Sequence, residues 1–413
     1  MRESLDFYLN QQSLISRFPQ VEGLCRQAED TFRQLAFPTR EDEDWKYTST
    51  DTFCKTRFEL DDASFPPPED LFPHTSTYLM SGVALSAAIL PKDVIIAPWA
   101  DALMLHAEKI APFLGHILKH QHGFQAQNTA MLSMGLFIYL PKDIRLEKPV
   151  RLVNWQNREK ARYLRHLVVL EEGSSMTLIE DYQGEDNVAY YTNTVTEVHL
   201  HAHGFLKHYK IQHEGSRAYH VGQLSVIQDT HSSFESHSFS LGGQWVRSDT
   251  DVQLSGQHAA CVMNGIYMTR DTQHLDHHTK IYHQVPQCVS HQDYKGLVAG
   301  ASRAVFNGIV HVYQDAQKTV AHQQNKNLLL SQQAEVDTKP QLEIYADDVV
   351  CTHGATVGQL DEEALFYLAT RGIPIEEARH LLMRAFVEEN LQKMNHPDLS
   401  HWMSGLLNQR MEW

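Results

Sequence analysis

The middle of the chain, from about Asp93 to Val350, alternates hydrophobic and polar positions in twos. Successive side chains of a β-strand point to opposite faces, so each alternating run predicts a strand with one buried face. Such runs occur at Leu164, His166, Val168 and Leu170; at Thr194, Thr196, Val198 and Leu200; at Ala304, Phe306, Val310 and Val312; and at Leu342, Ile344 and Ala346. The sequence therefore predicts a mainly β protein.

The runs follow one another at short, nearly regular intervals. Those that start near residues 164 and 176 are 12 residues apart, and those near 194 and 205 are 11 apart. No helix-length insert separates them, which is typical of a sandwich, barrel, propeller or solenoid. A solenoid buries its residues only against neighbouring coils and needs caps, so helical segments on both sides of the strand region favour a β-helix.

Helical patterns occur in the first 92 residues. Segments 14–18 (LISRF) and 32–35 (FRQL) have apolar residues at helical spacing. Segment 65–70 (FPPPED) cannot continue a helix, because proline lacks the backbone N–H and clashes with the preceding turn. We predict an N-terminal helical region with a proline-rich linker over residues 1–92.

The helical period returns after Gly354. Asp361 is placed to cap a short helix that Gly372 ends, and Pro374 suits the first turn of a second helix. The apolar stripes of the second helix and of a third one are Ala378, Leu381, Leu382, Ala385 and Phe386, and then Leu399, Trp402, Met403, Leu406 and Leu407. We predict a β-helix core over residues 93–355 and a C-terminal helical lobe over 356–413.

Charge and composition narrow the class of protein. The 413 residues carry a formal net charge of −16, which repels phosphate backbones, so no nucleic-acid partner is expected. The chain begins without a basic segment and apolar run, and no stretch approaches the ~18 apolar residues that span a bilayer. The five cysteines are far apart, odd in number and without a C-x-x-C pair. We expect a cytoplasmic protein with reduced thiols and no membrane partner.

Histidine is abundant, with 26 residues, and has two interpretations. Imidazoles bind metals, but these side chains are scattered among Gln, Thr and Ser, which favours a solvated surface. The cluster of His274, His277 and His278 is interpreted in the same way. No G-x-x-x-x-G-K-[ST], G-x-G-x-x-G or H-E-x-x-H motif is present, so the sequence gives no sign of ATP hydrolysis, dinucleotide use or a zinc protease site.

Cys351 and His353 form a candidate metal site. They lie two residues apart on the last predicted strand, so the thiol and the imidazole project from one face. Two ligands do not complete an iron site, and no other cysteine lies nearby in sequence, so a partner or distant coils would have to supply the rest. A small buried core residue is an equally good interpretation of Cys351. Asp347 and Asp348 either hold a turn or add oxygen ligands, and the turn is favoured.

Distinctive segments occur along nearly the whole chain. The most specific are residues 351–361 (CTHGATVGQLD) and 366–373 (FYLATRGI). Shorter ones are residues 38–48, 128–141 and 291–296. Together these segments resemble the SufB/SufD family of iron–sulfur cluster assembly proteins. SufB sequences read His-Glu-Ala-Thr where this chain reads His-Gly-Ala-Thr from His353, so the resemblance is to the SufD branch.

The resemblance implies a right-handed parallel β-helix with helical ends, in a non-catalytic subunit that supports iron acquisition. Its core would pair with SufB, and its C-terminal helices would bind the ATPase SufC. The candidate SufC contacts are Leu365, Phe366, Tyr367 and Leu368. His353, with Cys351, is implied as an iron ligand at the SufB interface, where a neighbouring chain completes the coordination. Iron or a cluster would bind transiently in the complex, and the isolated chain, without a stable cofactor, is a candidate homodimer.

Two alternatives stay open at this point. A SufB-like scaffold would hold a cluster by itself, which the sparse cysteines disfavour. A polysaccharide-binding or polysaccharide-active β-helix protein would need an acid and a base in a groove and usually an export signal. The missing signal and the specific terminal motif disfavour it.

Overall fold

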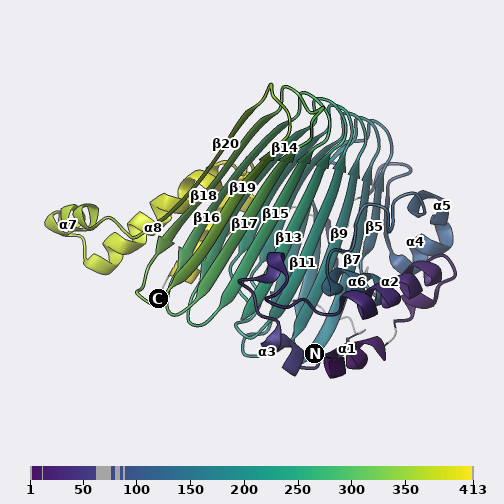
Figure 1. Ribbon diagram of the computed structural model, residues 1–413, viewed down its shortest axis with the longest axis horizontal. Coiled ribbons are helices and arrows are strands. Elements are labelled where there is room, and N and C mark those ends of the chain that lie inside the picture. Colours follow the sequence, from purple (N-terminus) through teal and green to yellow (C-terminus); the bar gives the residue numbers. More distant parts are fainter. Residues whose placement is uncertain (1, 12, 62–75, 80–83, 87–88, 412–413) are drawn as a thin grey trace.

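The computed structural model describes the chain except residues 1, 12, 62–75, 80–83, 87–88 and 412–413. The predicted proline-rich segment 65–70 lies outside the described residues. Two large sheets run side by side along the molecule, with helices around its N-terminal end and along one flank (Figure 1). Within the described chain, no helix combines the length and the hydrophobicity needed to cross a bilayer.

The strands form a parallel β-solenoid, which confirms the predicted β-helix core with helices on either side. The first sheet consists of β4 (Ile95–Pro98), β5 (Leu136–Leu140), β7 (Lys160–Leu170), β9 (Tyr191–Leu200), β11 (Tyr219–Gln228), β13 (Trp245–Leu254), β15 (His274–His283), β17 (Arg303–Val312) and β19 (Glu335–Ile344), with β1 (Glu59–Leu60) beside β7. The second sheet consists of β2 (Ser76–Leu79), β3 (Ala84–Ser86), β6 (Val150–Gln156), β8 (Ser175–Gly184), β10 (Phe205–Gln212), β12 (Ser233–Ser240), β14 (Ala260–Thr269), β16 (Val289–Val298), β18 (Val320–Leu329) and β20 (Val350–Gly358). The chain thus adds one strand to each sheet in turn.

The space between the sheets is filled in register, because equivalent residues of successive coils stack on one another. Leu206, Phe234 and Cys261 form one such row on β10, β12 and β14, and all three are buried. Burying a large apolar side chain contributes roughly 1.5–3 kcal/mol. The inward-facing apolar residues of the strands therefore form a continuous core only when the coils stack on one another.

Polar rows interrupt this core. Thr196 donates a hydrogen bond of 2.7 Å to the buried Glu180, and His208 Nε2 lies 3.2 Å from the same carboxylate oxygen. Neighbouring coils lie ~4.8 Å apart, so buried polar groups can satisfy one another across them. The predicted solvated surface is therefore wrong for a group of buried histidines, which are His122, His166, His208, His220, His237, His277, His278 and His283.

The N-terminal helices cover the outer face of the first sheet. They are α1 (Arg2–Leu9), α2 (Glu22–Leu35), α3 (Asp51–Lys55), α4 (Trp99–Leu105), α5 (Ala107–Ile110) and α6 (Gly123–Ala130), with 3-10 turns at Ile15–Arg17 and Glu43–Trp45. Aromatic rings make the contact: Trp45 stacks on Trp245 of β13 at 6.3 Å between ring centroids. Arg247 lies over the Trp45 ring at 4.3 Å and donates to the Asp44 carbonyl. Because α4, α5 and α6 lie within the segment 93–355, that segment is not all strand.

The C-terminal helices are α7 (Glu362–Thr370), α8 (Ile375–Gln392) and α9 (Pro397–Met411). The predicted cap of the first helix is confirmed, since the Asp361 side chain accepts hydrogen bonds from the Glu363 and Ala364 amides. The predicted stripe of α8 is partly wrong, because Leu381 and Ala385 are exposed. The buried face instead consists of Ala378, Met383, Val387, Asn390 and Leu391.

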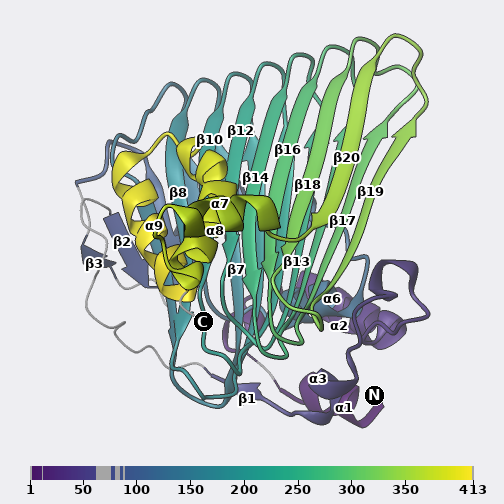
Figure 2. The same cartoon turned by 90° about the vertical axis from the view of Figure 1, so that its left-hand side faces the viewer.

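These helices do not cap the last coil, contrary to the prediction. Figure 2 shows α8 and α9 lying over the outer face of the second sheet. That face carries buried apolar residues on the earlier coils, such as Ile211, Phe239 and Ile266, and these pack against the helices. The last coils present polar residues such as His322 and Thr352, which give a helix no apolar surface to cover. Among the described elements, α8 and α9 leave the end of the solenoid uncovered.

Candidate functional site

The last coil, made of β19 and β20, ends the solenoid with free strand edges. Within the described chain, β19 pairs only with β17, and β20 pairs only with β18. Several apolar side chains are exposed there, among them Ile344, Tyr345, Val350 and Val357. An edge strand exposes a row of unpaired N–H and C=O groups and so invites another chain. Both predicted metal ligands lie on this coil.

Cys351 and His353 lie on the same side of β20, as predicted from their spacing. Cys351 pairs in register with the buried Ala321 and packs against the small apolar cluster that contains Val312 and Ala346. Burial raises the pKa of the Cys351 thiol above its usual value. Cys351 in the isolated chain is therefore a half-buried residue at the edge of the solenoid, and its surroundings do not favour the thiolate, the form that binds metals.

His353 is exposed and continues a row of buried amides. Its register partner is Gln323, which donates a 2.8 Å hydrogen bond to Gln292 Oε1 one coil earlier. Gln323 Oε1 is buried without a hydrogen-bond partner among the described residues. The imidazole therefore stands at the open end of a polar row inside the solenoid.

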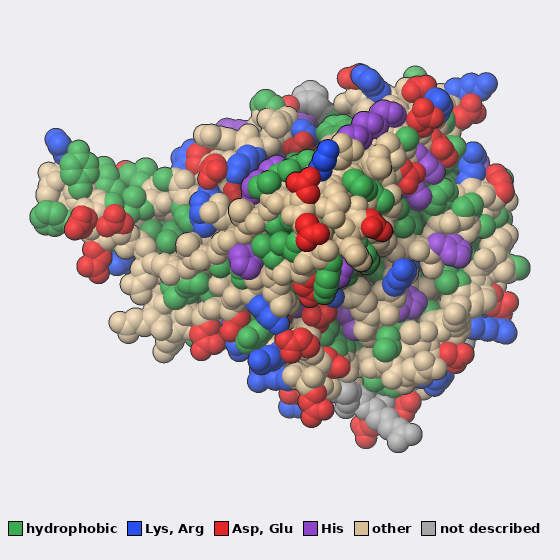
Figure 3. Space-filling view, turned by 45° about the horizontal axis from the view of Figure 1, so that its top comes forward, with side chains coloured by type: hydrophobic (Ala, Val, Ile, Leu, Met, Phe, Trp, Pro, Cys, Tyr) green, Lys and Arg blue, Asp and Glu red, His purple; other side chains and the backbone are tan. Residues whose placement is uncertain are grey.

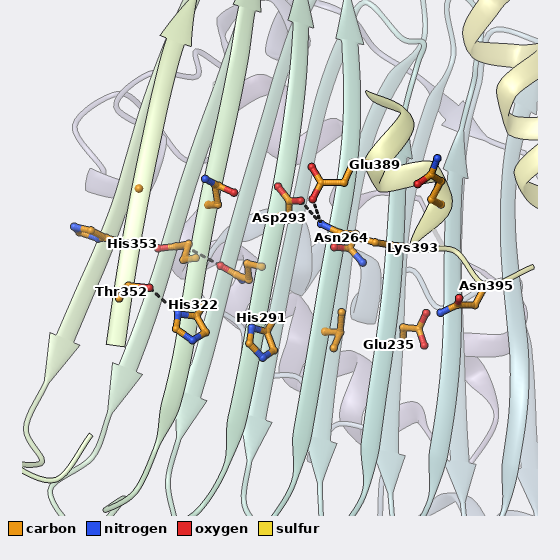
Figure 4. Close-up of a pocket in the computed structure, with 16 residues that line it drawn as sticks. Glu235, Asn264, His291, Asp293, His322, Thr352, His353, Glu389, Lys393 and Asn395 are labelled. Carbon is orange, nitrogen blue, oxygen red and sulfur yellow. Dashed lines mark hydrogen bonds and ion pairs between the residues drawn. The ribbon is translucent and has the colours of Figure 1, made fainter. Parts of the chain in front are cut away.

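A groove runs from this end along the outer face of the second sheet to α8. Its volume is about 940 Å³, and it is lined by residues of β12, β14, β16, β18, β20 and the end of α8. His353 and Thr352 lie at one end of it and Glu235 and Asn395 at the other, with Glu389 and Lys393 between them (Figure 4). The groove thus runs from the C-terminal lobe to β20, the strand that carries Cys351 and His353.

Two histidines that were not singled out from the sequence line the groove. His291 and His322 occupy equivalent positions on β16 and β18, and their rings stack at 5.1 Å between centroids. His322 Nδ1 lies 2.7 Å from the Thr352 hydroxyl on the last coil. Burial and the neighbouring His322 lower the pKa of His291. At neutral pH the His291 imidazole therefore offers an uncharged nitrogen atom, the form that binds metals.

Ion pairs fasten the end of α8 to the sheet beside the groove. Lys393 lies 2.6 Å from Asp293 of β16 and 3.1 Å from Glu389. The buried Lys295 contacts Glu389 at 2.9 Å and also donates to the Phe386 carbonyl. These two lysines hold the pKa of Glu389 down at about 2. The carboxylate is therefore charged at any physiological pH.

Helix α7 projects from the body and carries the predicted ATPase contacts. None of its residues is buried, and Phe366 and Tyr367 are 72% and 57% exposed. Leu365 and Leu368 are partly covered. Figure 3 shows hydrophobic side chains gathered on this projecting tip. Exposed large apolar groups on a helix tip are typical of a docking surface.

The groove residues Asp293, Lys393 and Glu389 could not be found from the sequence. They come from β16 and α8, about 100 residues apart. The sequence contains one weak sign of the groove. His291 and His322 are 31 residues apart, and this repeat places them at equivalent positions on neighbouring coils. Asp347 and Asp348 form the bend before β20, where the Asp348 amide donates to Gln317 Oε1, in agreement with the favoured turn.

Two protein-family models match this chain. Residues 153–386 match the family description "SUF system FeS cluster assembly, SufBD core domain", and residues 78–152 match "SufBD protein N-terminal region". The iron-sulfur cluster assembly protein SufD of Escherichia coli (strain K12) is 30% identical over 412 residues, which cover 95% of each chain. The chloroplastic protein ABCI7 of Arabidopsis thaliana is 30% identical over 88% of this chain and 80% of its own length.

A SufB protein is similar over a shorter range. The iron-sulfur cluster assembly protein SufB of Bacillus subtilis (strain 168) is 26% identical over 279 residues, which cover 64% of this chain and 57% of its own length. The SufD relative matches with higher identity and over more of the chain, as the residues after His353 indicated. The match of the core domain to more than half of the chain and the full-length similarity to a SufD protein lead to one conclusion: this chain belongs to the SufB/SufD family.

Proposed function

We propose that this chain is a non-catalytic subunit of an iron–sulfur cluster assembly complex and that its last coil docks on a SufB-type subunit. The observation that carries the proposal is the bare end of the solenoid, with two free strand edges and exposed apolar residues beside His353. A related solenoid has coils of the same shape, so it can continue both sheets. Strand addition supplies main-chain hydrogen bonds, and apolar contacts add to them.

His353 is proposed as an iron ligand at this interface. It is exposed in the isolated chain, and docking of a second coil would cover it and remove water from its imidazole. Ligands from the neighbouring subunit would then complete the coordination that Cys351 and His353 do not complete. Docking would also remove Cys351 further from water, so a thiolate there would need the metal charge to stabilise it. The isolated chain is accordingly expected to hold no stable cluster and to bind iron only transiently in the complex.

The exposed helix α7 is proposed to bind a SufC-type ATPase. Phe366 and Tyr367 supply the apolar anchors, and α8 links α7 to the groove through the Lys393–Asp293 ion pair. Movement of α7 by the ATPase would therefore pull on a helix that lines the same groove as His353. The ATPase activity belongs to the partner in this proposal.

The test uses the full chain co-expressed with SufB-type and SufC-type subunits from the same source. His353→Ala should leave the complex assembled, by co-purification and intact mass, and should lower its iron content and cluster yield. His401→Ala, an exposed histidine on α9, is the matched control and should change neither. Full cluster yield in the His353 variant would remove His353 from the mechanism, and failure of the wild-type chain to capture either subunit would refute the complex.

A SufB-like scaffold that holds a cluster alone is the second candidate. Anaerobic reconstitution of the isolated chain with iron and sulfide, followed by absorption spectroscopy, separates the two. A stable cluster would favour the scaffold, and a homodimer joined through the last coils would compete with SufB-type docking.

A further inference from the structure

A second histidine cluster lies on the first sheet, away from the groove. His199 is the penultimate residue of β9. Glu171, His201 and Asp229 directly follow the paired residues Leu170, Leu200 and Gln228 of three successive coils. His199 Nε2 and His201 Nδ1 each lie 3.2 Å from Asp229 Oδ2. One ligand atom from each of the three side chains fits within a span of 4.8 Å.

The two imidazoles are held in place by their surroundings. Their rings stack on each other at 4.4 Å between centroids and 20° between planes. Phe113 from the N-terminal region packs edge-on against both, at 5.2 Å from the His199 ring and 5.9 Å from the His201 ring. The side chains are only 18% and 28% exposed. The two imidazoles are thus packed together and shielded on one side by an aromatic ring.

The second nitrogen of His201 is left without a hydrogen bond. His201 Nε2 is buried and has no hydrogen-bond partner in the described structure, although Glu171 Oε2 lies 3.8 Å away. If Nδ1 carries the proton and donates to Asp229, Nε2 faces the Glu171 carboxylate as an unprotonated acceptor. That is an unfavourable pairing of two acceptors. It disappears if both nitrogens carry protons, or if the proton moves to Nε2 and Nδ1 binds a cation.

We propose that His199, His201 and Asp229 bind a divalent first-row transition-metal ion, with Glu171 orienting His201. Ligand atoms at ~2.1 Å from one metal lie about 3.0–3.4 Å apart, which matches both measured separations. Two imidazoles and one carboxylate form the ligand set that suits Fe²⁺ and Zn²⁺. Each imidazole binds in its neutral form, and His201 then donates from Nε2 toward Glu171, as a metal-bound histidine usually does toward a carboxylate.

This site is independent of the proposed function. It uses no residue of the groove or of the last coil, so its failure would leave docking at His353 untouched. Conversely, the site stands even if His353 binds no iron, because its argument rests on the contacts of these four side chains alone.

The experiment titrates the full chain, stripped of metal with a chelator, with Co²⁺ under anaerobic conditions. Co²⁺ absorbs visible light when imidazole and carboxylate groups bind it, and competition with Zn²⁺ and Fe²⁺ then gives their affinities. All chains in this titration carry His353→Ala, so the proposed interface site does not contribute to binding. His199→Gln and Asp229→Asn should weaken binding by on the order of 100-fold, and Glu171→Gln by about 10–100-fold.

The matched control is His311→Gln. His311 forms a histidine–carboxylate pair with Glu343 on the same sheet, at 2.8 Å, but is not part of a three-ligand group among the described residues. This variant should bind Co²⁺ like its parent. Two results would overturn the proposal: unchanged affinity in both His199→Gln and Asp229→Asn, or no Co²⁺ binding by the parent. Either would show that the cluster is an ordinary hydrogen-bonded triad.

A second measurement needs no variant that might misfold. One equivalent of Zn²⁺ should protect His199 of the wild-type chain from modification by diethyl pyrocarbonate, as read by peptide mass spectrometry. His311 should react equally with and without Zn²⁺. Equal modification of His199 in both conditions would overturn the proposal.

Discussion

Arg165 and Glu197 form a fully buried ion pair between β7 and β9, with 3.0 Å between Nε and Oε1. The second oxygen of Glu197 accepts a 2.9 Å hydrogen bond from the Leu118 amide. This carboxylate therefore fixes the N-terminal region to the solenoid. A buried charge that loses its partner is costly, whereas the intact pair contributes less than its Coulomb energy suggests.

Glu197→Gln should destabilise the protein by about 3–5 kcal/mol, because it leaves the Arg165 guanidinium buried without a counter-charge. Chemical denaturation of the full chain measures the loss. Glu22→Gln is the control, since its partner Arg26 lies on an exposed helix face and such pairs contribute about 0–1 kcal/mol. Equal stability of the two variants would show that the buried charge is compensated elsewhere.

Stability should fall as the pH falls from about 6.5 to about 4. Burial lowers the pKa of both His166 and His283 to about 4. In this window the unfolded chain binds protons at these residues and the folded chain does not, so stability rises with pH. The neutral imidazoles contribute their full share of the unfolding free energy only above the pKa that histidine has in the unfolded chain.

Removing one of these groups tests the assignment. His283→Gln should make the dependence of the unfolding free energy on pH shallower, by about 1–3 kcal/mol over the window. Thermal or urea unfolding measured from pH 7 to pH 4 checks this. The exposed His401→Gln should keep the wild-type slope, and an unchanged slope for His283→Gln would contradict the lowered pKa.

Phe366 and Tyr367 should matter for binding of the SufC-type subunit and hardly at all for folding. A Phe366→Ser, Tyr367→Ser double variant should lose at least tenfold in affinity, because exposed aromatic anchors dominate interfaces. Leu381→Ser, at an exposed apolar residue of α8, is the control and should bind normally. Titration of each variant with the purified ATPase gives the affinities. Normal affinity of the double variant would show that the ATPase docks on another surface.

Val357→Lys should weaken docking of the SufB-type subunit on the last coil. Val357 is 45% exposed on the free edge of β20, and a lysine there opposes strand addition, as it does on natural sheet edges. Met104→Lys, an exposed apolar position on α4, should leave the complex intact. Native mass spectrometry of the co-expressed subunits distinguishes the two, and an intact complex with Val357→Lys would argue against docking through this edge.

The sequence by itself determined the local structure. The period of two predicted the strands, and Asp361 and Gly372 predicted where α7 begins and ends, because such signals act within a few residues of the chain. The same spacing correctly placed Cys351 and His353 on one side of one strand. The motifs around them predicted the family, which the comparisons show.

Tertiary structure decided which polar groups meet. His199 and Asp229 are 30 residues apart and become neighbours only when coils stack, and the same stacking brings His291 to His322 and buries the histidines that composition assigned to the surface. The position of α8 and α9 also depended on it, since the apolar outer face that they cover is built from several coils. The physical reason is that a strand's alternation specifies two faces, whereas the register between coils decides what each face touches.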